Sequence, residues 1–297
     1  MEYNSKGNDY YIFTKNVRVD EQVRKSFNAL ALNTFGIDFE FWYQNGYWGD
    51  SYIPYALMDG ETVVSNISVN IIETTWKNQV KRYIQLGTVM TDEKYRGKGL
   101  SRFLMKKVLE DWRDNCDAVY LFANDSVLDF YPKFGFQKAQ EYQYLKSICK
   151  KEGMLKKLDM SLVEDRKLLL EMYRLSNPFS ALPMESNEGL LMFYCSQFMK
   201  ESIYYAENFE AVVIAGYDGE KMVCYDIFGL NNYQIDDILC TMAHQDTKIA
   251  ILGFTPNQID GFQITELKED NTTLFMLGGK ENLFKENQLM FPLLSHA

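Results

Sequence analysis

The sequence feature that most constrains the fold is a short glycine-containing loop between two strongly patterned segments. Residues 80–91 alternate with the two-residue period of a strand, and residues 100–112 carry apolar side chains at helical spacing. The loop between them contains the sequence Arg-Gly-Lys-Gly at residues 96–99. The pattern therefore predicts a strand, a tight loop and an amphipathic helix in immediate succession.

Such a loop can bind an anion, because glycines leave the N–H groups at a helix N-terminus uncovered and the helix dipole favours negative charge there. Arg96, Lys98 and Arg102 add positive charge. An ordinary strand-to-helix turn is the alternative interpretation. A nucleoside-triphosphate loop is excluded because its lysine must follow two widely spaced glycines, and a Rossmann fingerprint is excluded because it needs a third glycine.

The segments around the loop predict a mostly antiparallel sheet. Residues 53–58 and 62–71 form a predicted hairpin around the Asp59-Gly60 turn, and residues 80–91 follow as a third strand. Residues 118–123 form a continuous apolar strand after the helix. We therefore expect an α+β fold with three layers, in which a mixed, mostly antiparallel sheet is flanked by helices.

Further elements complete this first unit. A helix is expected at residues 21–33, and Ser126 is predicted to cap a short helix that ends near Phe134. Residues 137–145 are expected to form its last strand. The first domain would then span residues 1–147.

The length of 297 residues suggests two domains. Charged, loop-like residues 149–157 predict a linker, so the second domain is expected at residues 158–297. There, Ser161 and Glu164 predict a capping box at the start of a helix, and residues 274–277 predict a late strand. The order of expected elements echoes the first domain but lacks a glycine loop between strand and helix, which indicates a degenerate copy.

The composition excludes several classes of partner. With 46% hydrophobic and 24% charged residues, the chain is expected to be globular, and its net charge of −10 disfavours nucleic acid and anionic lipid while favouring cationic substrates. No apolar run approaches the ~20 residues that span a bilayer, and no signal pattern opens the sequence. We expect a cytoplasmic protein with a small-molecule substrate and no nucleic-acid or membrane partner. Self-association into a homo-oligomer is compatible with this interpretation.

The sequence also argues against metal and disulfide chemistry. The five cysteines are widely spaced and form no C-x-x-C pair, which predicts free thiols in a reducing compartment. His244 and His296 are the only histidines, too few for a zinc site or a Ser-His-Asp triad. We therefore expect no metal site.

Two motifs resemble those of the GNAT acyltransferase superfamily. Residues 89–100, with the sequence VMTDEKYRGKGL, resemble its motif A, whose core is Q/R-x-x-G-x-G/A; Lys94 stands where Gln or Arg is usual. Asn124 and residues 130–136 resemble the following motif B. The resemblance covers about residues 83–136. It implies the GNAT fold for the first domain and a degenerate GNAT-like α+β fold for the second.

The resemblance implies acetyl-coenzyme A as the donor substrate. The backbone of Val89, Met90 and Thr91 would bond its pantetheine arm, with Asn124 as a further binding residue. Tyr131 matches the tyrosine acid of the family, although a structural tyrosine packed in the core is the alternative. The residues that would hold the pyrophosphate are Arg96, Gly97, Lys98, Gly99, Leu100, Ser101 and Arg102.

The general base is not evident, because the strand before the loop carries no carboxylate at Tyr83, Gln85 or Gly87. Four carboxylates in the same part of the sequence are candidates for the general base, with a solvated surface charge as the alternative for each: Asp38, Glu40, Asp50 and Glu73. Five aromatic residues are candidates for stacking on a cationic acceptor, with core packing as the alternative: Trp42, Tyr43, Tyr47, Trp48 and Tyr55.

The two-domain plan also resembles the enhanced-intracellular-survival type of acetyltransferases, which add a third, lipid-carrier-like domain that this chain is too short to hold. In those proteins the terminal carboxylate enters the catalytic site, so the resemblance implies a catalytic role for Ala297. The apolar residues 291–294 predict a packed chain end, and His296 is the alternative proton acceptor.

The leading interpretation is an N-acetyltransferase that moves an acetyl group from acetyl-coenzyme A to a primary amine of a small, cationic acceptor by direct attack. Two alternatives stay open. One is a non-catalytic acyl-coenzyme A sensor or interaction protein, whose second domain binds a partner. The other is an enzyme of the same class that uses a longer acyl donor.

Overall fold

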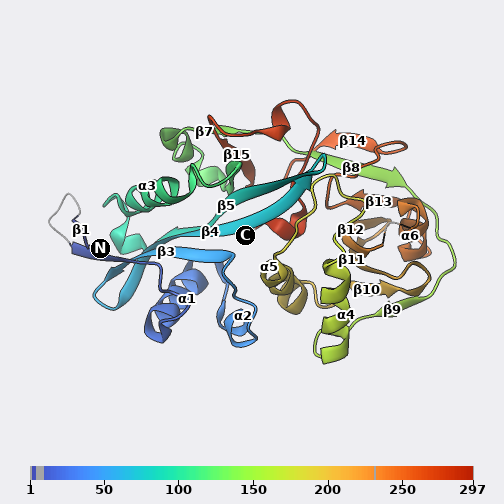
Figure 1. The fold of residues 1–297 in the computed structure, drawn as a ribbon, viewed down its shortest axis with the longest axis horizontal. Helices are drawn as coiled ribbons and strands as arrows, with labels where there is room; N and C mark the ends of the chain where they lie inside the picture. Colours follow the sequence, from blue (N-terminus) through green and yellow to red (C-terminus); the bar gives the residue numbers. More distant parts are fainter. Residues whose placement is uncertain (1, 5–9, 231, 297) are drawn as a thin grey trace.

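A computed structural model describes residues 2–4, 10–230 and 232–296, which form two mixed sheets with helices packed on them (Figure 1). In spatial order, the first sheet contains β1 (Glu2–Asn4), β2 (Tyr10–Thr14), β3 (Tyr52–Asp59), β4 (Thr62–Trp76), β5 (Gln79–Thr91), β6 (Ala118–Ala123), β15 (Thr273–Leu277) and β7 (Phe136–Lys138). The second sheet contains β14 (Gln263–Glu266), β8 (Tyr142–Ser147), β13 (Ile249–Leu252), β12 (Lys221–Gly229), β11 (Ala211–Asp218), β10 (Ile203–Ala206) and β9 (Leu155–Lys157). The α-helices are α1 (Glu21–Phe35), α2 (Glu40–Gln44), α3 (Leu100–Trp112), α4 (Val163–Tyr173), α5 (Glu188–Phe193) and α6 (Ile235–Met242). The α+β class is confirmed.

The first half of the molecule consists of the first sheet with α1, α2 and α3. Asp20 caps α1 by accepting hydrogen bonds from the N–H groups of Gln22 and Val23, and Gly36 ends the helix in the left-handed conformation. Figure 1 shows α3 on one side of this sheet and α1 with α2 on the other. Helix α3 and strand β6 have the bounds that the sequence predicts, because both are specified by strong local periodicity.

Two predicted helix caps are wrong. Residues 125–134 form two short 3-10 segments, Asp125–Val127 and Tyr131–Phe134, and the residue before the first of them is Asn124 instead of Ser126. Helix α4 begins at Val163 after Leu162, whose side chain makes no capping bond. The N–H of Ser161, just before the helix, donates to the carboxylate of Asp159. The expected capping box would have used the side chain of Glu164 as the acceptor. Local turns therefore replace both caps.

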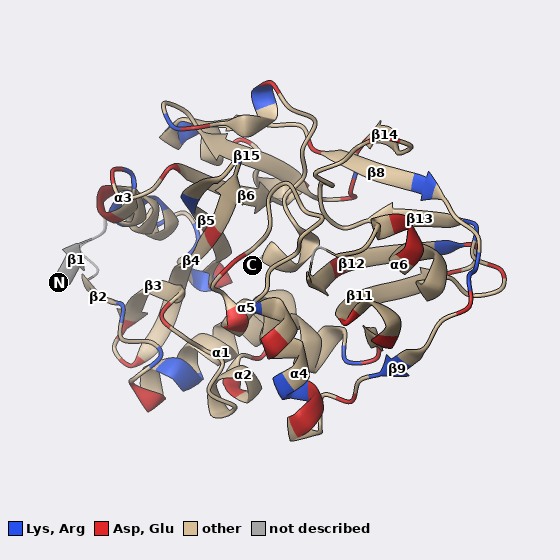
Figure 2. Ribbon diagram, turned by 45° about the vertical axis from the view of Figure 1, so that its right-hand side comes forward, with Lys and Arg blue, Asp and Glu red and all other residues tan. Residues whose placement is uncertain are grey.

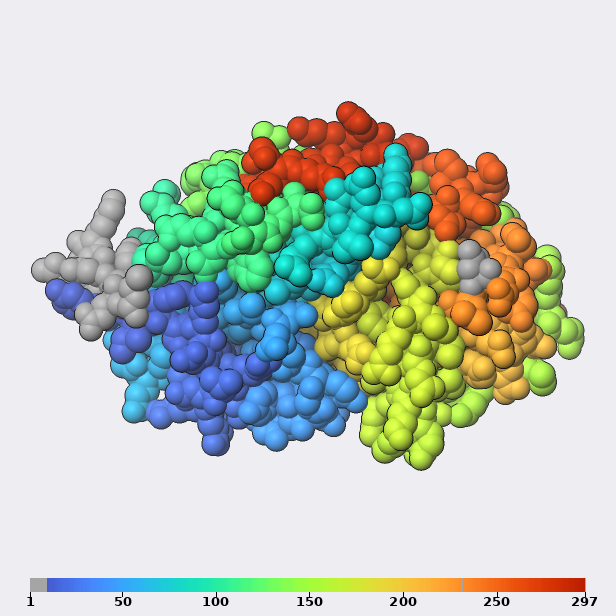
Figure 3. Space-filling model, viewed as in Figure 1, coloured from blue at the N-terminus to red at the C-terminus, as the bar shows by residue number. Residues whose placement is uncertain are grey.

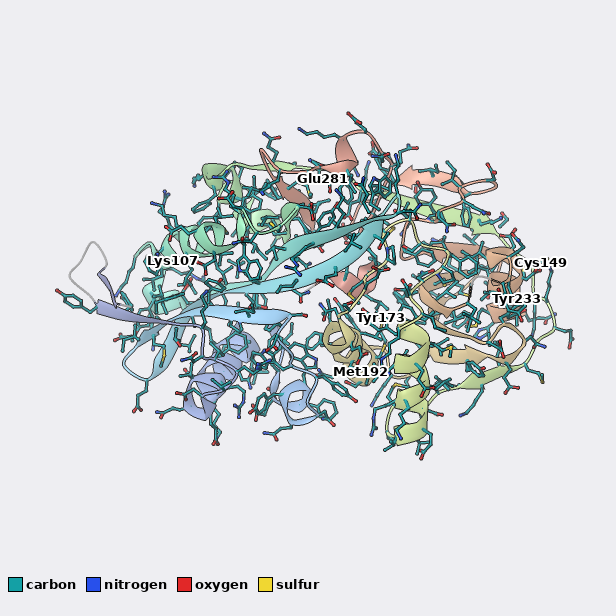
Figure 4. The ribbon with its side chains drawn as sticks, viewed as in Figure 1. Lys107, Cys149, Tyr173, Met192, Tyr233 and Glu281 are labelled. Carbon is teal, nitrogen blue, oxygen red and sulfur yellow. The ribbon has the colours of Figure 1, made fainter. Side chains whose placement is uncertain are left out.

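The two sheets exchange their last strands. β8 follows β7 in the chain but pairs with β13 and β14 in the second sheet, whereas β15 follows β14 but inserts between β6 and β7 in the first sheet. After β15, Glu281 accepts hydrogen bonds from Lys81 and Tyr83 beside β5 (Figure 4). Figure 3 shows the C-terminal segments lying across the first half. The predicted strand at 137–145 is therefore two strands, and the predicted strand at 274–277 belongs to the first sheet.

The second half, which consists of the second sheet with α4, α5 and α6, repeats the strand pattern of the first. In the second half, β10, β11 and β12 pair in an antiparallel order, α6 follows, and β13 pairs parallel to β12. In the first half, β3, β4 and β5 pair in the same antiparallel order, α3 follows, and β6 pairs parallel to β5. This topology supports the expected GNAT-like second unit. The predicted linker contains β9, and β8 and β15 cross between the sheets, so the division at residues 147 and 158 stays a prediction.

Three hydrophobic clusters hold the molecule together. One packs α3 on the first sheet, and another packs α6 on the second sheet. The third cluster joins the halves, because it contains Tyr83 and Tyr120 from the first sheet, Phe228 from the second, and the C-terminal residues Phe291 and Leu294. In Figure 4, Met192 and Tyr173 lie where α5 and α4 face the first half. Burial of this shared apolar surface favours a fixed arrangement of the two halves.

Charged residues of both signs are distributed over both halves (Figure 2). Within the described ranges, no helix combines the length and the apolar composition needed to cross a bilayer. The five cysteines are free thiols. Across the same residues, no cluster of three or more potential metal ligands occurs.

Candidate active site

The candidate site begins where β5 and β6 separate. The two strands pair in parallel from Tyr83 to Leu86, opposite residues 118–121, and β5 then turns away from β6. At the turning point the pairing of β5 with β4 shifts register, and Thr88 has a positive φ of 47°. A bulge of this kind bends its strand, so the edge of β5 beyond Leu86 faces an open space instead of β6.

Side chains hold the bulge in place. The hydroxyl groups of Tyr52 and Thr88 lie 2.6 Å apart in a hydrogen bond, and the amide nitrogen of Asn66 donates to the carbonyl of Thr88 at 3.0 Å. Both Asn66 and Tyr52 are buried. The strained conformation of Thr88 is therefore supported from two neighbouring strands.

The space between the separated strands is a pocket of about 740 Å³. Its lining residues come from the end of α1, from β5, from the start of α3, from β6 and from the 3-10 segments that follow. They are Thr34, Phe35, Ile37, Leu86, Gly87, Thr88, Val89, Met90, Thr91, Arg96, Ser101, Phe122, Asn124, Ser126, Val127, Phe130 and Tyr131. The pocket thus brings together both predicted motifs.

The N-terminus of α3 lies at one end of this pocket. Gly97 and Gly99 have φ values of 79° and 83°, a conformation that favours glycine, and no side chain caps the helix at Gly99. The first intrahelical hydrogen bond runs from the N–H of Phe103 to the carbonyl of Gly99, so the N–H groups before it have no partner within the helix. The first turn holds no acidic residue. An anion would meet uncovered donors and a favourable dipole here.

The charged residues of the loop are exposed and make surface contacts. Arg96 pairs with Glu93 at 3.3 Å, and the ammonium of Lys98 donates to the hydroxyl of Tyr11 at 3.4 Å and lies 5.0 Å from the ring of Tyr95. Arg102 lies over the ring of Phe134 at 5.8 Å. Ser101 and Thr91 share a hydrogen bond of 2.8 Å, which ties the helix start to β5. Leu100 is buried, so its side chain anchors the loop and leaves only its backbone for a ligand.

Tyr131 and Asn124 line the pocket from the segments that follow β6. Tyr131 is 4% exposed and packs against Phe130, Phe136 and Phe275. Burial raises the pKa of its phenol to about 12, so Tyr131 keeps its proton at neutral pH. Asn124 is exposed and contributes to the pocket lining after the end of β6.

The C-terminal segment is packed, as predicted, and it reaches the pocket wall. Leu294 and Ser295 are fully buried, and the imidazole of His296 stacks on Phe122 with ring centroids 3.9 Å apart. Burial lowers the pKa of His296 to about 4, which makes it neutral and a weak base at pH 7. The hydroxyl of Tyr194 donates to the carbonyl of His296. Ala297 lies outside the described residues.

The four carboxylates proposed by region do not line the pocket. Glu40 binds Arg24 at 3.0 Å, Asp50 binds Arg18 and Glu73 binds Arg82. The carboxylate of Asp38 accepts the N–H of Glu40. These groups therefore stabilise local structure.

The predicted aromatic cage for a cation is not formed at this pocket. Trp42, Trp48 and Tyr55 are buried in the core, and Tyr43 packs on the guanidinium of Arg24. Trp42 and Tyr47 contribute to a separate cleft of about 640 Å³ between the α2–β3 loop and the α4–α5 loop.

Sequence reasoning missed several lining residues. Thr88, which the side chain of Asn66 holds in the bulge, lines the pocket together with the apolar residues Phe35, Ile37 and Phe122. One signal was present, because Gly87 interrupts a strand rich in β-branched and apolar residues, a pattern typical of a bulge. Phe35 and Ile37 carry no such signal, since their positions depend on how α1 packs.

Comparisons with known proteins agree with this architecture. The family model of the acetyltransferase (GNAT) domain matches residues 23–139. No curated protein matches the sequence.

Solved structures of similar fold extend over both halves. A probable N-acyltransferase of unknown function from Enterococcus faecalis V583 has a TM-score of 0.61 and 14% identity, covering 90% of this chain and 71% of that chain. A GCN5-related N-acetyltransferase from Kribbella flavida has a TM-score of 0.56 and 14% identity, and the match covers 90% of this chain and 71% of that chain. Eis1 from Mycobacterium abscessus has a TM-score of 0.55 and 10% identity, and the match covers 89% of this chain and 72% of that chain. At these identities the likeness is one of fold.

Proposed function

Because the model of the acetyltransferase (GNAT) domain matches residues 23–139, we propose that this chain transfers an acetyl group from acetyl-coenzyme A to the primary amine of a small, cationic acceptor. The observation that supports this proposal most is the open pocket between the separated ends of β5 and β6, beside the uncapped N-terminus of α3. A donor with an extended arm and a pyrophosphate fits these two features together.

The backbone of β5 would bind the arm of the donor. The edge of β5 at Val89, Met90 and Thr91 lies beyond the last pair with β6, so its N–H and C=O groups can bond an extended amide chain in the way that a strand does. One of these N–H groups would polarise the thioester carbonyl. Asn124 lies across the pocket and would contact the same arm.

The glycine loop would hold the pyrophosphate. The backbone of Gly97–Arg102 supplies the donors, and Arg96, Lys98 and Arg102 supply positive charge. Acetyl-coenzyme A contributes the activated acyl group, and the chain contributes orientation and proton transfer.

Two groups would handle the protons. As the N–C bond forms and the C–S bond breaks, Tyr131 would supply a proton to the thiolate, and the carboxylate of Ala297 would accept the proton from the amine. Tyr131 suits this role because its phenol stays protonated at neutral pH. His296 stacks on Phe122 of the pocket wall, but its lowered pKa disfavours the imidazole as the base.

The first test mixes the purified protein with acetyl-coenzyme A and a panel of primary amines. We expect free thiol to appear together with an N-acetylated amine identified by mass spectrometry. A protein that binds acetyl-coenzyme A but releases no thiol with any amine would instead be an acyl-coenzyme A sensor.

The second test concerns the terminus. Appending a few residues after Ala297, or deleting residues 295–297, should depress turnover and leave donor affinity unchanged, because the proton acceptor is displaced. The same residues appended before Met1 serve as the control. Full turnover by the C-terminally extended protein would exclude Ala297 from the site.

A further inference from the structure

The pocket also has apolar lining residues that the proposed donor contacts do not use. Phe35 is the last residue of α1, Ile37 follows it after Gly36, and Phe122 lies on β6; all three line the pocket together with Gly87 and Thr88 of β5. We call Phe35, Ile37 and Phe122 the apolar wall. Phe35 is 40% exposed, which is a high value for an aromatic residue at a pocket. The wall therefore offers apolar surface that a ligand can cover.

Packing holds two members of the apolar wall. The ring of Phe122 stacks on the imidazole of His296, and Ile37 packs against the cluster that joins the two halves. A preorganised wall of this kind can select the shape of a ligand, because little side-chain entropy is lost on binding.

The same pocket offers no acidic side chain to a second ammonium group. Among the described lining residues, Arg96 alone is charged, and it lies at the donor loop. Asp38 follows Ile37 in the chain and accepts the N–H of Glu40, and Glu40 is held by Arg24, whose guanidinium lowers the pKa of the Glu40 carboxyl. A second charge on an acceptor would therefore meet no side chain of opposite sign here, and the hydroxyl groups of Thr34 and Thr88 already bond to the carbonyl of Leu30 and to Tyr52.

On the basis of the proposed function, we propose that the acceptor is a monoamine with an apolar body, such as an arylalkylamine or a branched alkylamine, and that Phe35 determines this specificity. The amine nitrogen would face the bulge at Thr88, and the body would lie against the apolar wall. Polyamines and aminated sugars would be poor acceptors, even though the overall negative charge of the chain attracts them.

The test compares kcat/KM for 2-phenylethylamine, isopentylamine, putrescine and glucosamine with the full chain. We expect the two apolar amines to exceed the two polar amines by roughly 100-fold, since a polar group buried without a partner and the loss of apolar contacts each cost about tenfold or more. The matched variants are Phe35→Ala, Phe35→Glu and the control Phe41→Ala, because Phe41 is exposed on α2 and does not line the pocket.

Phe35→Ala should reduce kcat/KM for the apolar amines about tenfold, and Phe35→Glu should shift the preference toward putrescine, while Phe41→Ala keeps the preference of the native protein. Donor affinity, measured by calorimetry, should be equal in all four proteins, which also shows that they are folded. A preference for putrescine or glucosamine in the native protein, or an unchanged ratio of kcat/KM between the apolar and the polar amines in both Phe35 variants, would overturn the inference while leaving acetyl transfer intact.

A longer donor supplies a further outcome. If Phe35→Ala instead changes the ratio of octanoyl- to acetyl-coenzyme A use and not the ranking of amines, the apolar wall belongs to the acyl group and the inference is wrong. If no amine releases thiol although acetyl-coenzyme A binds, the proposed function itself fails. The two failures are therefore distinguishable.

Discussion

The parallel strand pairs of the two halves open at corresponding points but lead to different surroundings. β5 and β6 separate after Leu86, and β12 and β13 separate after Cys224, next to a register shift in the pairing of β11 with β12. In the first half the opening is a pocket. In the second half the chain fills the corresponding opening, because the N–H of Leu293 donates to the carbonyl of Gly253 and Thr255 exchanges hydrogen bonds with Met290.

The helices that follow these strand pairs differ in charge. The first turn of α3 has no acidic residue, whereas that of α6 contains Asp236 and Asp237, which bind Lys146 and Lys151. Carboxylates at a helix N-terminus satisfy the dipole and repel an anion. A bulged parallel pair is therefore not sufficient for a phosphate-binding site, which also needs an unfilled opening and an N-terminus without acidic side chains.

The exchange of strands between the halves predicts that neither half folds alone. In a fragment of residues 1–147, the four buried side chains of β15 at residues 274–277 would be missing from the first sheet. Their loss removes on the order of 6–12 kcal/mol of apolar burial, comparable to the whole stability of a domain. We expect no cooperative thermal transition by circular dichroism for this fragment.

The matched experiment supplies the missing strand. Coexpression of residues 1–147 with residues 148–297 should restore a cooperative transition if the fragments exchange β8 and β15 as the intact chain does. A fragment of residues 1–147 that folds and binds acetyl-coenzyme A by itself would show that the first half is autonomous.

The difference in phosphate binding can be tested with one glycine in each half. Gly99→Val places a branched side chain at a φ of 83° beside the N-terminus of α3, and we expect acetyl-coenzyme A affinity to fall at least roughly 100-fold in calorimetry. Gly219→Val introduces similar strain at a φ of 55° in the β11–β12 turn, with open space around it. Equal affinities of the two variants for the donor would remove the glycine loop from the site.

Much of the first half could be predicted from the sequence because its elements are locally specified. The alternation of residues 80–91, the helical spacing of residues 100–112 and the loop between them depend on nearest neighbours along the chain. The strand character of residues 274–277 was also evident. Its partner was not, because a strand pattern says which face is buried but not which sheet receives it.

The apolar wall could not be predicted for a related reason. Phe35 and Ile37 reach the pocket only through the packing of α1 on β4 and β5, and Phe122 only through the separation of β6 from β5. The aromatic residues 42–55 likewise suggested a cation-binding cage, but none of the five candidates lines the pocket, and Glu40 and Glu73 are paired with arginines elsewhere. Global composition does not locate charge on the surface.

A pair of tyrosines tests which half carries the chemistry. Tyr131→Phe should lower kcat roughly 100-fold, the loss expected for a general acid, and should leave donor affinity unchanged because the ring remains. The control is Tyr217→Phe, which removes a hydroxyl bonded to the carbonyl of Met242 in the second half. Stopped-flow thiol release at saturating substrates measures both. Full turnover by Tyr131→Phe would make Tyr131 a packing residue.

The smallest expected effect concerns a buried carboxyl at the filled opening. Asp226 accepts hydrogen bonds from Asn177 and from the N–H of Ile227, and burial raises its pKa from 3.8 to about 7. Between these two pH values, the carboxyl of Asp226 is ionised in the unfolded chain but keeps its proton in the folded chain. The contribution of Asp226 to stability is therefore full below pH 4 and is lost as the pH rises through 7. Asp226→Asn should therefore gain on the order of 1–3 kcal/mol over the native protein in urea unfolding at pH 8, and little at pH 4. Donor affinity should not change, because this opening is filled by the chain itself.

A parallel pH dependence of the stability of the two proteins would show that Asp226 is ionised in the folded state. A loss of donor affinity in Asp226→Asn would show that the two openings are coupled.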